Sequence, residues 1–123
     1  MTQIAPEKMA LYRASAQQRM QAQRQLLDER FEHAWEVAKE AAVLLQTEFG
    51  ADQVVAFGSL VDKSLFHIRS DIDLAVWGLP GQVYYRAVGR LQGLATAVAI
   101  DLVCIEDASA TLQAVIKQDG VIL

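Results

Sequence analysis

The sequence has 123 residues, of which 53% are hydrophobic and 21% are charged, and its formal net charge is −4. This length suits one domain with a single modest core, and the composition is typical of a folded protein rather than a disordered one. No uncharged apolar run approaches the roughly 18 residues of a membrane span, and no signal-peptide pattern occurs at the start. A negative net charge also disfavours general nucleic-acid binding. We therefore expect a cytoplasmic protein that binds neither membranes nor nucleic acid in general.

One long helix, or two consecutive ones, is expected from Pro6 onward, because proline suits the first helical turn and no further glycine or proline occurs before Gly50. Its second half carries apolar residues at helical spacing and should pack on the core. The first half is polar, and a continuous helix would extend roughly 65 Å. We therefore divide the chain into an N-terminal helical arm, residues 1–26, and a domain, residues 27–123.

The arm differs from the domain in charge. Residues 1–25 carry four basic side chains and one acidic side chain, whereas the rest of the chain carries 7 basic and 14 acidic ones. Three interpretations of the arm stay open: it is a solvated segment, it bends back, or it packs on another chain. In the last case it would form a homodimer or a hetero-oligomer.

Strands and helices alternate after Gly50. The expected elements are a strand over 53–57, a short helical turn over 60–63, a strand over 71–77, a helix over 83–95, a strand over 99–105, a helix that follows Ser109, and an apolar tail over 121–123. This order predicts an α/β domain with one central sheet.

The most informative stretch joins Gly58-Ser59, after the first strand, to Asp71-Ile72-Asp73 in the second. Side chains alternate along a strand, so the two aspartates point to one face. Because adjacent carboxylates repel each other, a hard divalent cation is expected between them. Gly58 lets a ligand approach the backbone closely, and the Ser59 hydroxyl with nearby N–H groups can hold phosphate oxygens. These features indicate phosphoryl or nucleotidyl transfer.

This order of a Gly-Ser turn, a loop and an Asp-x-Asp pair resembles the signature of the DNA polymerase β-type nucleotidyltransferase superfamily. It is most similar to the single-domain minimal nucleotidyltransferases, which occur in toxin–antitoxin pairs. The resemblance covers the chain from about Trp35 to the C-terminus. It implies a small mixed sheet, with helices on one face and the carboxylates on the other, preceded here by the long N-terminal helix. It also implies a third carboxylate on a later strand, for which Asp101 is the candidate.

The resemblance assigns the site residues as follows. The expected catalytic residues, which are also the expected ligands of two Mg²⁺ ions, are Asp71, Asp73 and Asp101. The residues expected to bind the ATP phosphates are Gly58, Ser59 and Ser70. Ser70 has an alternative role as a cap of the loop before the Asp-x-Asp pair. Two basic loop residues either meet phosphates or are solvated, Lys63 and Arg69. Three aromatic residues either line a base pocket or pack on the protein, Trp77, Tyr84 and Tyr85.

The function implied by the resemblance is metal-dependent transfer of AMP from ATP to a hydroxyl group of a partner protein. That partner would be a HEPN-type toxin, and this chain would be the antitoxin that neutralises it. Two alternatives stay open. One is a non-catalytic antitoxin that acts by complex formation, and the other is an adenylyltransferase of small molecules, a class that usually carries an additional substrate domain.

Overall fold

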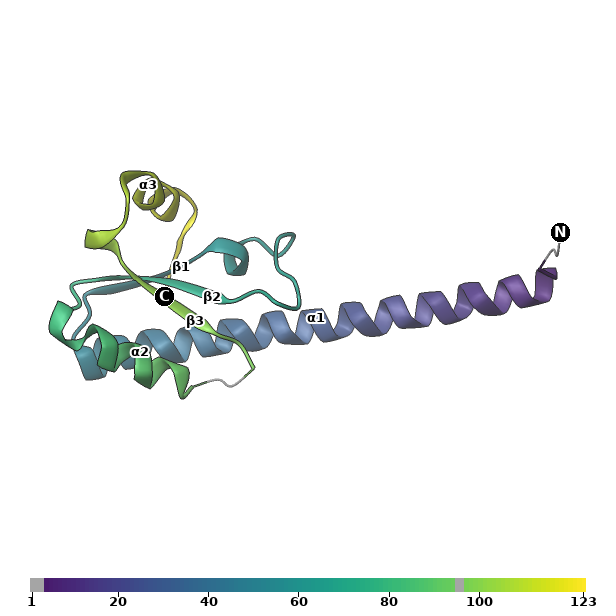
Figure 1. Ribbon diagram of the computed structural model, residues 1–123, viewed down its shortest axis with the longest axis horizontal. Helices are drawn as coiled ribbons and strands as arrows, with labels where there is room; N and C mark the ends of the chain where they lie inside the picture. Colours follow the sequence, from purple (N-terminus) through teal and green to yellow (C-terminus); the bar gives the residue numbers. More distant parts are fainter. Residues whose placement is uncertain (1–3, 95–96) are drawn as a thin grey trace.

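The computed structural model describes residues 4–94 and 97–123. Its elements in chain order are α1 (Pro6–Phe49), β1 (Gln53–Phe57), η1 (Gly58–Val61), β2 (Ile72–Trp77), η2 (Gly81–Val83), α2 (Tyr84–Gln92), β3 (Ile100–Cys104), η3 (Ile105–Asp107), α3 (Ala110–Asp119) and β4 (Val121–Ile122). The sheet lies on the C-terminal half of α1, and the N-terminal half of α1 projects away from the domain (Figure 1). Residues 1–3 of the expected arm, and Ala95 in the expected 83–95 helix, lie outside the described residues.

The long N-terminal helix is confirmed as one continuous element of 44 residues. It ends at Phe49 and is capped by Gly50, which has a φ of 71° and whose N–H donates to the carbonyl of Leu45. The N–H of Ala51 donates to the same carbonyl over 3.0 Å. Glycine is favoured in this left-handed conformation, which satisfies the last carbonyl groups of a helix. All the buried residues of α1 lie at or after Ala34. Although α1 is long, neither it nor any other described helix is apolar enough to cross a membrane.

The four strands form one mixed sheet in the order β3-β2-β1-β4. β1 is antiparallel to both β2 and β4, whereas β2 and β3 are parallel. In this register Asp73 of β2 lies between Phe57 of β1 and Asp101 of β3. The end of β1 and the starts of β2 and β3 therefore meet at one end of the sheet.

Both faces of the two central strands are apolar. One face, with Val54 and Leu74, packs on α1 and α2, while the other face, with Val55 and Ala75, packs on Ile116 of α3. The expected fold class is thus confirmed, with one difference in the placement of a helix: α3 covers part of the face opposite to α1 and α2 (Figure 1). The physical reason is that every residue from Val54 to Phe57 is buried, so each face needs its own cover.

Candidate active site

Two of the three expected carboxylates lie side by side on neighbouring strands. β2 and β3 are parallel and pair Asp73 with Asp101, so both side chains project from the same face of the sheet. This is the face opposite to α1 and α2, because the alternate residues Ile72 and Ile100 point to the core on that other side. Asp71 comes just before β2. The topology therefore gathers the three acids at one end of the sheet.

The pKa of Asp73 is raised by the two neighbouring acids as well as by burial. Asp73 is half-buried, whereas Asp71 and Asp101 are exposed. Burial, followed by the negative charges of Asp101 and Asp71, raises the pKa of Asp73 from 3.8 to about 6. Because both neighbours act through space on the same carboxyl group, all three acids belong to one electrostatic cluster.

Gly58 lies directly against this cluster. Its φ is 73°, which favours glycine, and a Cβ atom added at this position would collide with Oδ2 of Asp73. The backbone at Gly58 therefore lies closer to the Asp73 carboxylate than a residue with a Cβ atom would permit. The two parts of the sequence motif, separated by a loop, are adjacent in space.

A cleft opens on the other side of the Gly-Ser turn. Its volume is about 650 Å³, and it lies between η1 and the C-terminal half of α3. Gly58 and Ser59 form part of its wall, together with the exposed apolar side chains of Leu65 and Val115. Asp62, Gln118 and Asp119 also line it, so the cleft is partly apolar and partly acidic. An anionic group would need a cation beside it to offset these two acids.

The three carboxylates are of the donor type that suits a divalent cation, but they are not arranged around one point. Among residues 4–94 and 97–123, no three Asp, Glu, His or Cys side chains lie close enough together to form a ready-made metal-binding group. The three carboxylate groups are thus near one another, but their oxygen atoms do not surround a common point. Like charges repel, which is consistent with this spacing. Carboxylate oxygens are the ligands that Mg²⁺ prefers, and a cation would relieve the repulsion that helps to raise the pKa of Asp73.

Ser70 holds the loop that leads to Asp71. It is only 5% exposed. Its Oγ accepts a hydrogen bond of 2.9 Å from the His67 N–H, and its own N–H donates to the His67 carbonyl over 2.9 Å. Of the two roles considered for Ser70, the cap of the loop is the one that these bonds describe.

Lys63 connects the same loop to α1. Its Nζ lies 3.0 Å from Oδ1 of Asp28 and 5.5 Å from the ring centroid of Phe31. Phe66, a buried loop residue, packs edge-on against Phe31 with ring centroids 5.1 Å apart. Lys63 therefore faces α1, while Arg69 is exposed.

Arg30 is a neighbour of the site that the sequence did not indicate. Arg30 and Asp71 line the same cavity of about 500 Å³. Its Nη2 donates to the carbonyl of Ala97 over 2.8 Å, and its buried Nε has no hydrogen-bond partner among the described residues. Arg30 and Ala97 are far apart in the sequence, and no local pattern predicts that they are in contact. Only the tertiary structure shows that Arg30 lies beside the site.

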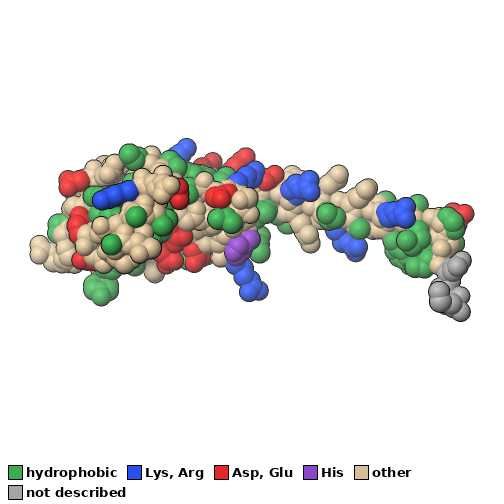
Figure 2. Space-filling model, turned by 90° about the horizontal axis from the view of Figure 1, so that it is seen from above, with side chains coloured by type: hydrophobic (Ala, Val, Ile, Leu, Met, Phe, Trp, Pro, Cys, Tyr) green, Lys and Arg blue, Asp and Glu red, His purple; other side chains and the backbone are tan. Residues whose placement is uncertain are grey.

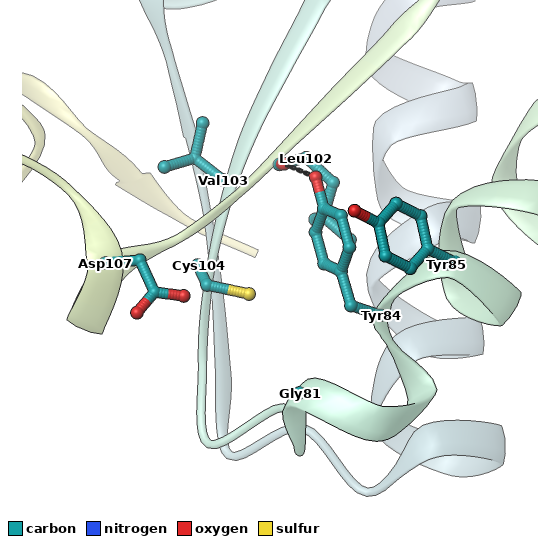
Figure 3. A pocket seen from close by; sticks show the side chains of 7 residues that line it. All are labelled: Gly81, Tyr84, Tyr85, Leu102, Val103, Cys104 and Asp107. Atoms are coloured by element: carbon teal, nitrogen blue, oxygen red, sulfur yellow. Dashed lines mark hydrogen bonds between the residues drawn. The ribbon is translucent and has the colours of Figure 1, made fainter.

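Tyr84 and Tyr85 line a separate cavity of about 430 Å³ beside the edge strand β3 (Figure 3). The Tyr84 hydroxyl donates to the carbonyl of Leu102 over 2.8 Å, and the side chain of Cys104 points into the same hollow. Burial raises the pKa of both Tyr84 and Cys104, so the phenol and the thiol stay protonated near neutral pH. Leu102 and Cys104 alternate with Asp101 along β3, whereas Val103, which also lines the cavity, lies on the same face as Asp101. The cavity therefore lies at the edge of the sheet and reaches both faces.

Solved structures supply the comparison with known proteins. No protein-family model and no curated protein matches the chain. A structure described as a minimal nucleotidyltransferase matches with a TM-score of 0.59 and 26% identity, over 74% of this chain and 94% of that chain. A toxin–antitoxin structure with AMP-PNP matches with a TM-score of 0.55 and 24% identity, over 68% and 69% of the two chains.

The MntA–HepT toxin–antitoxin complex matches with a TM-score of 0.54 and 22% identity, over 72% of this chain and 69% of that chain. A further structure of this complex carries two Asp-to-Glu substitutions at positions separated by one residue. These comparisons confirm the resemblance that the sequence carries at the level of the fold: the chain has the fold of a minimal nucleotidyltransferase and shares this fold with a chain of the toxin–antitoxin structures.

Proposed function

We propose that this protein is a metal-dependent nucleotidyltransferase that transfers AMP from ATP to a hydroxyl group of a partner protein, with release of pyrophosphate. The partner would be the toxin of a toxin–antitoxin pair, of the HEPN type by the family resemblance, and this chain would be its antitoxin. The observation that carries the proposal is the contact between the Gly-Ser turn and the acids, where a Cβ at Gly58 would collide with Asp73 and Asp101 lies next to Asp73.

The comparisons support the same assignment. One similar toxin–antitoxin structure was solved with AMP-PNP, an ATP analogue. In another, two aspartates with the spacing of Asp71 and Asp73 were replaced. Both observations belong to those proteins, and they agree with a nucleotide substrate and a functional Asp-x-Asp pair in this one.

The chain's own residues divide the work in the following way. Asp71, Asp73 and Asp101 would hold Mg²⁺, which when bound neutralises triphosphate charge and lowers the pKa of the attacking hydroxyl. The backbone at Gly58 and the Ser59 hydroxyl would orient phosphate oxygens at the mouth of the cleft. Asp101 is exposed and is the candidate to accept the proton of the acceptor hydroxyl. Such transfer depends on positioning and charge neutralisation, so a site this small can suffice.

Label transfer tests the proposal. With α-labelled ATP, Mg²⁺ and the co-expressed partner, the wild-type chain should label the partner, and the double variant Asp71→Asn/Asp73→Asn should not. Circular dichroism of the double variant should show an intact fold. Unchanged transfer by this variant would exclude the proposed site. Full neutralisation of the toxin by a variant that cannot transfer label would instead favour an antitoxin that acts by binding alone.

A further inference from the structure

The projecting half of α1 contributes no buried residue to the core of the domain. The apolar residues of α1 that pack on the domain begin at Leu27, so residues 6–26 extend beyond it for about 30 Å at 1.5 Å per residue. Large apolar side chains of this segment are open to solvent: Leu11 is 67% exposed, Tyr12 60%, Leu26 59% and Met20 58%.

The apolar residues of the arm continue the stripe that packs on the domain. In the packed half this stripe advances in steps of three or four residues, through Leu27, Phe31, Ala34, Ala38, Ala41 and Leu45. Steps of the same size lead backward through Gln23 to four arm residues, Met20, Ala16, Tyr12 and Met9, which we call the arm stripe. A helix returns to the same face every three or four residues. The face of α1 that packs on the domain therefore continues into the arm as a mainly apolar face, interrupted by Gln23, while Leu11 and Leu26 lie outside it.

Basic side chains border the arm stripe on both sides. By helical phase, Lys8 and Arg19 lie on one side of it and Arg13 and Arg24 on the other. Figure 2 shows Lys and Arg side chains along the arm and Asp and Glu side chains gathered on the domain. Side-by-side pairing of the arms of two copies would bring the same positive charges into contact, and like charges repel. The complementary surface is apolar with an acidic border.

The base of the arm is fixed to the active-site end of the sheet. Asp28 pairs with Lys63 at 3.0 Å, and the Phe31 ring packs on Phe66, both in the loop before the Asp-x-Asp pair. Arg30 donates to Ala97, just before β3. The arm thus leaves the domain beside the segments that carry the carboxylates, and these contacts set its direction relative to them.

We propose that the arm stripe docks the protein partner of this chain through a helical surface whose apolar residues are bordered by acidic ones, and that the arm thereby holds the partner beside the carboxylates. Such amphipathic helix recognition is a common mode of protein association. The docking is inferred from the arm stripe, the charges beside it and the contacts at the base of the arm. The reaction that follows docking rests on the proposed function.

A pair of charge-matched variants tests the docking. Tyr12→Glu/Met20→Glu alters the arm stripe, whereas Leu11→Glu/Ala22→Glu makes the same change on the side of the arm that faces away from it. The probe is the toxin of the proposed pair, co-expressed with this chain and purified. The stripe variant should bind it about tenfold or more weakly in a calorimetric titration, and the control within about threefold of wild type. Circular dichroism should show equal helix content in both.

Further readouts separate docking from chemistry. The stripe variant should keep the wild-type affinity for ATP and show a raised KM for the partner. Equal partner affinity of the stripe variant and wild type would overturn the inference. A stripe-dependent dimer of the chain alone in sedimentation would also overturn it, because a second copy would then be the occupant. If docking requires the stripe but even wild type transfers no label, the inference holds and the proposed function fails.

Discussion

Replacement of Asp73 by asparagine should stabilise the metal-free protein near neutral pH. Burial and the charges of Asp101 and Asp71 raise the pKa of Asp73 from 3.8 to about 6. The unfolded chain therefore loses this proton near pH 4, and the folded protein keeps it until about pH 6. An acid whose pKa is higher in the folded state lowers the free energy of unfolding as the pH rises between these two values.

The magnitude follows from the same two values. A rise in pKa from 3.8 to about 6 corresponds to at most about 3 kcal/mol. Because Asp73 is only half-buried, solvent screening reduces the expected effect to about 1–2 kcal/mol. Asparagine carries no charge at any pH, so the variant should match wild type near pH 3.5 and exceed it by this amount above pH 7.

Urea unfolding followed by circular dichroism measures the difference. Both proteins should be compared in EDTA at about pH 3.5 and pH 7.5, with Asp52→Asn as a control for loss of an exposed acid at the other end of the sheet. Addition of Mg²⁺ at pH 7.5 should stabilise wild type and leave Asp73→Asn unchanged. An equal difference between variant and wild type at both pH values would refute the electrostatic argument.

Three further changes test local features of the structure. Gly58→Ala should lower the free energy of unfolding by about 1–3 kcal/mol, because φ is positive and the new Cβ meets Asp73; an unchanged urea midpoint would contradict that close approach. Ser109→Ala should cost about 1 kcal/mol, since the Ser109 side chain accepts from the Leu112 N–H at the start of α3; a neutral result would show that this cap is not formed. A double-mutant cycle on the exposed pair Asp28–Lys63 should give a coupling below about 1 kcal/mol, and a larger value would mean that the pair is shielded from solvent.

Local patterns in the sequence predicted the features that depend on a few consecutive residues. Gly50 ends α1 and Ser109 begins α3 as their residue types suggest. The strands follow apolar runs, and the phase of β2 places Asp73 on the face opposite to its core residues. Each of these outcomes depends on backbone chemistry within one turn or one strand.

Long-range geometry was less accessible to sequence reasoning. Nothing in the α3 sequence states which face of the sheet it covers, because both faces of β1 are apolar. The contact of Arg30 with Ala97, and of Phe31 with Phe66, depends on how α1 crosses the domain. Ser70 could cap a loop or meet a phosphate by residue type alone, and only its bonds to His67 assign it to the loop.

The central claim is that the Gly-Ser turn and the three acids together bind a nucleotide with its metal. Its most direct test needs no partner: a calorimetric titration of ATP into the purified chain, with Mg²⁺ and with EDTA. The account predicts binding that requires Mg²⁺, that is lost in Asp101→Asn and that is kept in Asp52→Asn. Equal ATP affinity in wild type and Asp101→Asn, or binding that is indifferent to Mg²⁺, would contradict it.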